Sequence, residues 1–307
     1  MRPRRRMMML SCSARSSLDT MKTPAGLQPL IDDGIVDEVI RALKSGKEAS
    51  VYVVRCGAEV RCAKVYKDMG QRSFQQRAQY QEGRKVRGSR QARAMARSTS
   101  YGRKEQESAW KNAEVTALYQ LAAAGVRVPR PYGYFNDVLV MELVTDAQGE
   151  CAPRLGEVEL TPEKAREFHG FIVQQIVRML CAGLIHGDLS EYNVLIDASG
   201  PVIIDLPQAV DAAGNNNAFA MLERDVRNIT ETLGRFAPEL LVTDFAAEMW
   251  SLFEQGELKP ETKLTGIFIK DETSANLGNV LEAIEDAREE ALRRQLGRDE
   301  AQAAGGK

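Results

Sequence analysis

The chain has 307 residues, of which 44% are hydrophobic and 27% charged, and its formal net charge is −2. This profile is normal for a globular protein and gives room for one two-lobed domain. Because the charge is nearly balanced, whole-chain electrostatics indicate no class of partner. No run approaches the roughly 18 consecutive apolar residues that a membrane span needs.

The five cysteines are scattered along the chain, and no Cys-x-x-Cys pair occurs. The sequence therefore indicates neither a zinc site nor a disulfide framework. Reduced thiols and a cytoplasmic location are the simplest expectation.

The N-terminal part of the chain, residues 1–26, opens with a basic run and continues with a serine-rich stretch. Its apolar run, residues 7–10, is shorter than the roughly 7–15 residues of a signal-peptide core, so we predict a disordered extension. Residues 27–44 carry apolar side chains at helical spacing, which predicts a helix leading into the first strand.

Residues 45–52 read Ser-Gly-Lys-Glu-Ala-Ser-Val-Tyr, where a glycine-rich phosphate loop would be expected. A single glycine followed by small and polar residues can still turn between two strands. Backbone N–H groups and the hydroxyls of Ser45 and Ser50 could then reach phosphate oxygens, with Lys47 in the same turn. An ordinary hairpin is the alternative.

Strands are predicted at 49–55 and 58–66, and Lys64 lies inside the second. A lysine is an unusual choice for a core strand. Protein kinases use such a lysine to hold the α- and β-phosphates of ATP and to pair with a glutamate on the next helix. An exposed lysine on an edge strand is the alternative.

Glu114 is the candidate partner of Lys64, because its surroundings have near-helical apolar spacing. The apolar residues concerned are Trp110, Val115, Leu118 and Leu121. Glu105 and Glu107 are weaker candidates at the start of that helix, and a surface pair of Lys64 with Glu114 is the alternative.

A basic insertion, residues 69–104, separates the lysine strand from this helix. It holds ten Lys and Arg against one acid, Glu82, which gives a segment charge of +9. We predict a flexible insertion. It is either a solvated loop over the ATP cleft or a segment whose cations bind the phosphates of RNA or of a ribosomal partner.

Two further strands are predicted at 132–135 and 138–144. The second contains Met141, Glu142 and Leu143 and resembles the strand that enters the hinge between the lobes of a kinase. Backbone groups of Glu142 to Val144 would there bond an adenine edge; a plain buried strand is the alternative.

The most informative stretch runs from Ile185 to Asp197 and is followed by Ile203-Ile204-Asp205. Phosphoryl transfer from ATP needs residues of these types at this spacing. Asp188 would orient the attacking oxygen and accept its proton, while Asn193 and Asp205 would bind metal. A turn at His-Gly-Asp with a capping asparagine is the alternative.

The remaining pattern is helical. Thr161, Pro162 and Glu163 predict a helix start, and Gly183 its end. Asp225 could orient the catalytic-loop backbone or be an exposed charge. Helices are predicted at 218–233, 245–253 and 280–298.

Together these residues resemble the RIO family of atypical protein kinases, over roughly residues 30–255. The matching parts are residues 45–52, Ala63 to Tyr66, Met141 to Leu143, Ile185 to Asn193, Ile204-Asp205 and Leu222 to Val226. The 45–52 loop is the most specific part, since His-Gly-Asp also occurs in small-molecule kinases. Asp205-Leu206-Pro207 replaces Asp-Phe-Gly, and no Ala-Pro-Glu follows, which implies a core without the usual activation segment.

The resemblance implies an α+β, two-lobed kinase-like fold: a β-rich N-lobe at 27–144, a mainly helical C-lobe at 145–260 and a C-terminal tail at 261–307 with a charged helix. It implies ATP and Mg²⁺, with Mn²⁺ as the alternative ion. It also implies phosphorylation of serine or threonine, often in the protein itself, or ATPase turnover with transient phosphorylation of Asp205. The branch without an N-terminal winged helix, in a bacterial version, fits this short chain.

Two other functions remain open. One is a small-molecule phosphotransferase of the aminoglycoside-kinase type, which shares His-Gly-Asp and a later Ile-Asp. The other is an ATP-gated RNA- or ribosome-binding switch, which the basic insertion favours.

Overall fold

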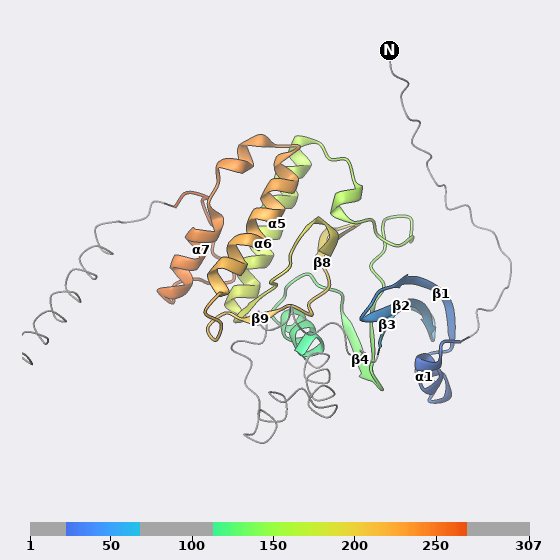
Figure 1. The fold of residues 1–307 in the computed structure, drawn as a ribbon. Coiled ribbons are helices and arrows are strands. Elements are labelled where there is room, and N and C mark those ends of the chain that lie inside the picture. Colours follow the sequence, from blue (N-terminus) through green and yellow to red (C-terminus); the bar gives the residue numbers. More distant parts are fainter. Residues whose placement is uncertain (1–22, 68–112, 269–307) are drawn as a thin grey trace, which may run out of the picture.

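The computed structural model describes residues 23–67 and 113–268, and it has two lobes (Figure 1). A five-stranded antiparallel sheet forms the N-terminal lobe, and three longer helices dominate the C-terminal lobe. The α+β, two-lobed fold expected from the sequence is confirmed. The predicted insertion at 69–104 and the predicted helix at 280–298 lie outside the described residues.

The N-lobe sheet has the strand order β1-β2-β3-β5-β4. Its strands are β1 (Glu38–Ser45), β2 (Ala49–Cys56), β3 (Glu59–Tyr66), β4 (Pro131–Phe135) and β5 (Val138–Glu142). Lys64 stands opposite Val51 on β2 and Leu139 on β5, so it lies in the middle of the sheet. Strand residues alternate between faces, which places Lys64 and Tyr66 on the same side.

The two faces of the sheet pack against different parts of the chain. Ala63 and Val140 pack with Leu27 and Leu30 of the short N-terminal helical segment. That segment consists of η1 (Ala25–Leu27) and α1 (Gln28–Asp32). Tyr66 and Leu139, on the opposite face, join the main core that the helix over residues 113–123 and the C-lobe share.

The helix predicted over 27–44 is wrong for most of its length. The chain leaves α1 through Gly34, whose φ of +69° favours glycine. Residues Glu38–Ser45 then form β1 and pair with β2. The hydrogen bonds offered by β2 decide the conformation here, and the apolar spacing of the segment itself cannot show them.

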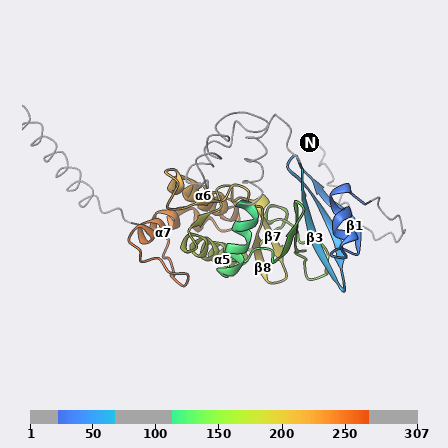
Figure 2. The same ribbon diagram turned by 90° about the horizontal axis from the view of Figure 1, so that it is seen from below.

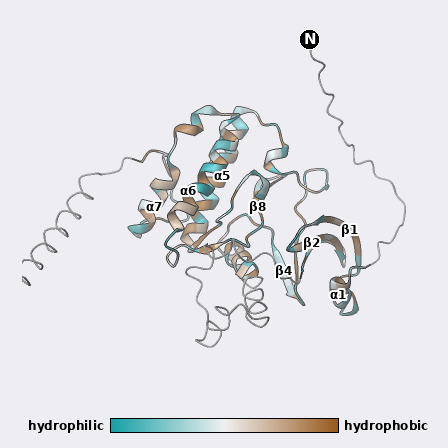
Figure 3. Ribbon diagram, in the orientation of Figure 1, coloured by the Kyte–Doolittle hydropathy of each residue, from teal (hydrophilic) through white to brown (hydrophobic). Residues whose placement is uncertain are grey.

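The C-lobe packs α5 (Pro162–Cys181), α6 (Ala218–Gly234) and α7 (Phe245–Glu254) around one core (Figure 2). The predicted start of α5 is confirmed, because Thr161 Oγ1 accepts a hydrogen bond from Lys164 N at 3.2 Å. Gly183 ends this region with a φ of +78°. Hydrophilic and hydrophobic residues alternate along α5 and α6, as expected of helices with one buried face (Figure 3). Within the described ranges, no helix is long and apolar enough to cross a membrane.

Short elements complete the C-lobe. β6 (Leu184–Ile185) pairs with β9 (Val210–Asp211), and β7 (Val194–Asp197) pairs with β8 (Gly200–Ile203). The 3-10 turns are η3 (Leu155–Glu157), η4 (Glu191–Asn193) and η5 (Pro238–Val242). The lobe extends past residue 260, since the backbone N–H groups of Thr265 and Gly266 donate to Glu248 on α7.

Candidate active site

Lys64 joins the two lobes at the centre of the candidate site. Its ammonium forms an ion pair with Glu114 on the helix over 113–123 and lies 3.1 Å from Asp205 Oδ1. Only 13% of the Lys64 side chain and 5% of that of Glu114 are exposed, so the pair is largely shielded from water. Tyr66 completes the cluster by donating to Glu114 Oε2 at 2.7 Å. The structure thus brings together Lys64 and the glutamate expected from the sequence.

The charges of this cluster stabilise one another. Burial lowers the pKa of Lys64, but Glu114 and Asp205 outweigh burial and raise it above its ordinary value. Burial in turn raises the pKa of Asp205, and the charge of Lys64 outweighs that effect and lowers it. Both groups are therefore charged at neutral pH.

Asp205 has an unusual backbone. Its φ is +68°, in the left-handed region that few non-glycine residues adopt. It follows β8 and Ile204, whose N–H donates to the carbonyl of Asn193 at 2.9 Å. Such strain persists where the surroundings over-determine it, which is common at functional sites.

The loop between β6 and β7 carries Asp188. Gln208 Nε2 donates to Asp188 Oδ2 at 3.0 Å, and Asn193 Nδ2 donates to the Asp188 carbonyl at 2.9 Å. Burial raises the pKa of the Asp188 carboxyl, although His186 and Arg224 oppose this rise. The Asn193 amide nitrogen is thus engaged with the loop, which leaves its side-chain oxygen as the candidate metal ligand.

Asp225 on α6 holds this loop in shape. Its carboxylate is buried and accepts from Gly187 N at 2.7 Å and Leu189 N at 2.9 Å. Of the two sequence interpretations of Asp225, orientation of the backbone of the Asp188 loop is therefore correct, and an exposed charge is not. His186 connects this loop to the segment after β8, since its Nε2 lies 3.1 Å from the Ile204 carbonyl oxygen. No local pattern in the sequence indicates Gln208 as a partner of Asp188.

The donors available for a metal are the carboxylate of Asp205 and the amide oxygen of Asn193. Among the described residues, no group of three or more His, Cys, Asp or Glu could hold a metal ion by itself. This set fits Mg²⁺, which commonly takes one or two carboxylates together with phosphate oxygens.

The predicted phosphate loop is the β1–β2 turn. Ser45 Oγ and Ser50 Oγ lie 3.1 Å apart. Lys67, which no sequence pattern indicates, donates to Ser45 Oγ at 2.9 Å and to the Gly46 carbonyl at 2.8 Å. Lys47 is exposed in the turn. Ser45 and Ser50 are therefore already hydrogen-bonded within the loop.

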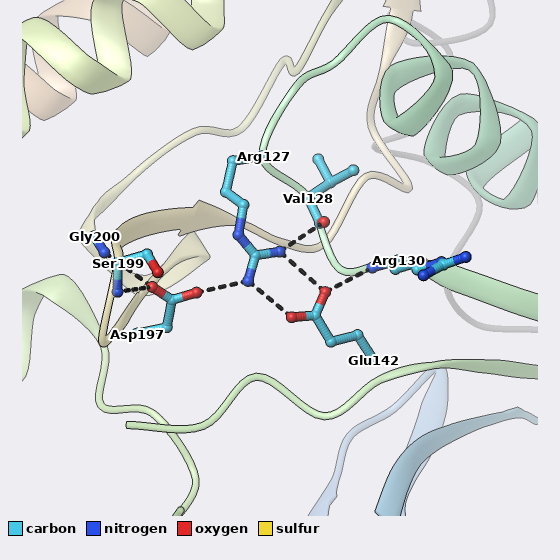
Figure 4. Close-up of polar contacts among 7 residues, drawn as sticks. All are labelled: Arg127, Val128, Arg130, Glu142, Asp197, Ser199 and Gly200. Carbon is cyan, nitrogen blue, oxygen red and sulfur yellow. Dashed lines mark hydrogen bonds and ion pairs between the residues drawn. The ribbon is translucent and has the colours of Figure 1, made fainter. Parts of the chain in front are cut away.

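Met141, Glu142 and Leu143 are half-buried at the end of β5. Two of the backbone groups in the predicted adenine-binding stretch are already bonded: Glu142 N donates to the Arg130 carbonyl at 2.8 Å, and Ala152 N donates to the Val144 carbonyl at 3.0 Å. The Glu142 carboxylate forms a bidentate ion pair with Arg127 (Figure 4).

Comparison with known proteins assigns the family. A RIO domain profile matches residues 50–246. "RIO-type serine/threonine-protein kinase Rio1" of Haloferax volcanii is 35% identical over 216 residues, which cover 69% of each chain.

Eukaryotic relatives match over a smaller part of their length. Human "Serine/threonine-protein kinase RIO1" is 30% identical over 66% of this chain and 34% of its own. The Schizosaccharomyces pombe relative "Serine/threonine-protein kinase rio1" is 27% identical over 81% of this chain and 49% of its own. The RIO domain profile matches well over half of the sequence, and the chain therefore belongs to the RIO family of serine/threonine-protein kinases.

Proposed function

We propose that the chain transfers the γ-phosphoryl group of ATP to a serine or threonine hydroxyl with Asp188 as the base. The meeting of Lys64 from β3 and Asp205 from the end of β8, at 3.1 Å, supports this most strongly. This contact places Lys64, a cation suited to binding phosphates, beside Asp205, a carboxylate suited to binding a metal ion. Asp188 lies on the neighbouring loop, which Asp225 orients.

Lys64 is the proposed ligand of the α- and β-phosphates, and Glu114 positions it. A buried lysine held between two carboxylates stays protonated and points in a fixed direction. Asp188 accepts the proton of the attacking hydroxyl, and its raised pKa makes it a better proton acceptor than an ordinary aspartate. Fixed positions of this kind supply much of the rate in phosphoryl transfer.

Asn193 and Asp205 are the proposed ligands of Mg²⁺, with Mn²⁺ as the alternative ion. When bound, the metal neutralises charge on the β- and γ-phosphates. The two ligands flank one hairpin: Asn193 directly precedes β7, and Asp205 follows β8 after one residue. Their spacing is therefore set by the pairing of β7 with β8.

The remaining nucleotide contacts are proposed for the turn at Ser45, Lys47 and Ser50 and for the end of β5, from Met141 to Leu143. The protein substrate is the chain itself or an unidentified protein. An ATPase mode, in which the Asp205 carboxylate attacks the γ-phosphorus and ADP leaves, is a second outcome of the same site.

We also propose a cytoplasmic location, on the ground of the scattered cysteines.

Incubation with γ-labelled ATP and MgCl₂, followed by mapping of the label, tests the proposal. Asp188→Ala should lower transfer by ~10²–10⁴-fold, the usual contribution of a positioned base, while ADP binding stays near wild type. Acid-stable label would identify a serine or threonine ester, and hydroxylamine-labile label would identify an aspartyl phosphate. Near-normal transfer by Asp188→Ala would refute the role of Asp188.

A further inference from the structure

Arg127 is the centre of a polar network that the proposed catalytic roles do not use (Figure 4). Its guanidinium donates through Nη2 to Glu142 Oε1 at 2.8 Å and through Nη1 to Glu142 Oε2 at 3.0 Å. Nη2 also donates to Asp197 Oδ2 at 2.6 Å. One cation thus bridges two carboxylates that lie on different lobes.

Each carboxylate fixes a further piece of backbone. Glu142 Oε2 also accepts from Arg130 N at 3.0 Å. Asp197 Oδ1 accepts from Ser199 N at 2.6 Å and from Gly200 N at 2.9 Å, which shapes the turn between β7 and β8. The network therefore reaches both the end of β5 and the tip of the hairpin.

The backbone of Arg127 is itself fixed on both sides. Its N–H donates to Gln175 Oε1 on α5 at 2.8 Å, and its carbonyl accepts from Ile203 N on β8 at 2.9 Å. The backbone that carries the guanidinium is therefore held relative to α5 and β8. Bidentate arginine–carboxylate pairs add geometric specificity as well as energy.

The elements that Arg127 connects carry different parts of the nucleotide site. β5 ends at Glu142, in the stretch proposed to contact adenine. The β7–β8 hairpin carries Asn193 and Asp205 beside its open end and Asp197 near its tip. A shift of the hairpin against β5 would change the distance between the base site and the metal ligands.

We propose that Arg127 is a positioning residue that couples nucleotide-base binding to metal binding, by holding the end of β5 and the β7–β8 hairpin in one fixed arrangement. This inference rests on the proposed function. Coupling of two ligands requires an element whose arrangement both ligands favour, and the bridged β5–hairpin unit is that element.

The test measures a coupling factor, defined as the Kd of ADP without Mg²⁺ divided by the Kd with Mg²⁺, by titration calorimetry. Adenosine, which lacks phosphates, reports the base site alone. Asp197→Asn removes the ion pair between Arg127 and the hairpin, while the backbone bond from Ile203 and the pair of Arg127 with Glu142 remain. A triple variant, Arg127→Met with Glu142→Gln and Asp197→Asn, removes all three charges and leaves no unpaired buried ion.

We expect the coupling factor to fall by about fivefold or more in both variants, the lower range of typical couplings. The affinity of Asp197→Asn for adenosine should change far less. Arg166→Met is the matched control, because Arg166 forms an ion pair with Glu239 on the surface of the C-lobe. It should keep the wild-type factor.

A wild-type coupling factor in Asp197→Asn would overturn the inference, even if the variant melts at a lower temperature, because the bridge would then be structural only. That single variant decides the matter if the triple variant does not fold. Wild-type protein that binds neither adenosine nor ADP would instead refute the proposed nucleotide site, and the coupling with it.

Discussion

At the scale of single residues, the site depends on side chains that are held by neighbours. The Asp188 carboxylate is oriented by Gln208, and the Asp188 carbonyl is held by Asn193. Asp205 is fixed by Lys64 and by its own left-handed backbone. The proposed reactive groups are thus held in place by contacts within the protein, and such fixed positions are the main requirement of phosphoryl transfer.

Gln208 should therefore matter for turnover and little for nucleotide binding. Gln208→Ala removes the hydrogen bond at 3.0 Å that orients the Asp188 carboxylate. We expect kcat to fall by about tenfold, the equivalent of roughly 1.4 kcal/mol, with the KM for ATP unchanged. Steady-state kinetics with saturating MgCl₂ measure both.

Gln174→Ala is the control for this variant. Gln174 donates to the Pro260 carbonyl at 2.7 Å and contacts no candidate site residue by that bond. Equal losses of kcat in both variants would show that the effect of Gln208→Ala is general and not exerted through Asp188.

At the scale of elements, local sequence predicted most of the structure. Apolar periodicity and the cap at Thr161 predicted α5, and similar patterns predicted α6 and α7 close to their observed bounds. The error at β1 arose because strand pairing, which is not local, decided the conformation. Such long-range hydrogen bonds have no local signature in the sequence.

The candidate site shows the same division. Asp188, Asn193 and Asp205 are predicted from the sequence because they lie close together in a motif. Arg127 was not, because its partners lie 15 and 70 residues away and neither separation has a local signature. Lys67 and Gln208 were missed for the same reason, since only folding brings them to Ser45 and Asp188.

The packing of α5 against α6 makes stability depend on pH. His169 on α5 is buried, and its Nε2 lies 2.9 Å from Thr230 Oγ1 on α6. Burial lowers the pKa of His169 from 6.5 to about 4. Between these values the unfolded chain binds a proton that the folded chain does not, so stability falls as the pH decreases. The titration of His169 should lower the free energy of unfolding by about 2 kcal/mol between pH 8 and pH 5.

Denaturant unfolding of wild type and His169→Asn at both pH values measures this contribution. The variant cannot titrate at this position, so its loss of stability between pH 8 and pH 5 should be smaller by that amount. Parallel losses in the two proteins would contradict the assignment of the pH dependence to His169.

At the scale of the whole molecule, charge is strongly segregated. The basic insertion at 69–104 carries +9, so the remaining residues carry −11 to give the total of −2. Apart from the basic run that opens residues 1–26, the rest of the chain should therefore repel polyanions. Affinity for RNA should come mainly from the insertion, and it should fall steeply with salt because each neutralised phosphate releases counterions.

Changing Arg84, Lys85, Arg87, Arg90 and Arg93 to serine should therefore weaken binding to a single-stranded RNA oligonucleotide and flatten its dependence on salt. If each cation neutralises one phosphate, the slope of log K against log salt should decrease by roughly 0.7 for each cation removed. Fluorescence anisotropy across a salt series measures both quantities, and the affinity for ADP should persist.

Arg55→Ser with Arg166→Ser is the control, since both arginines form surface ion pairs outside the insertion. Wild-type protein without measurable RNA affinity at low salt would refute the predicted nucleic-acid partner and favour the alternative of a solvated loop.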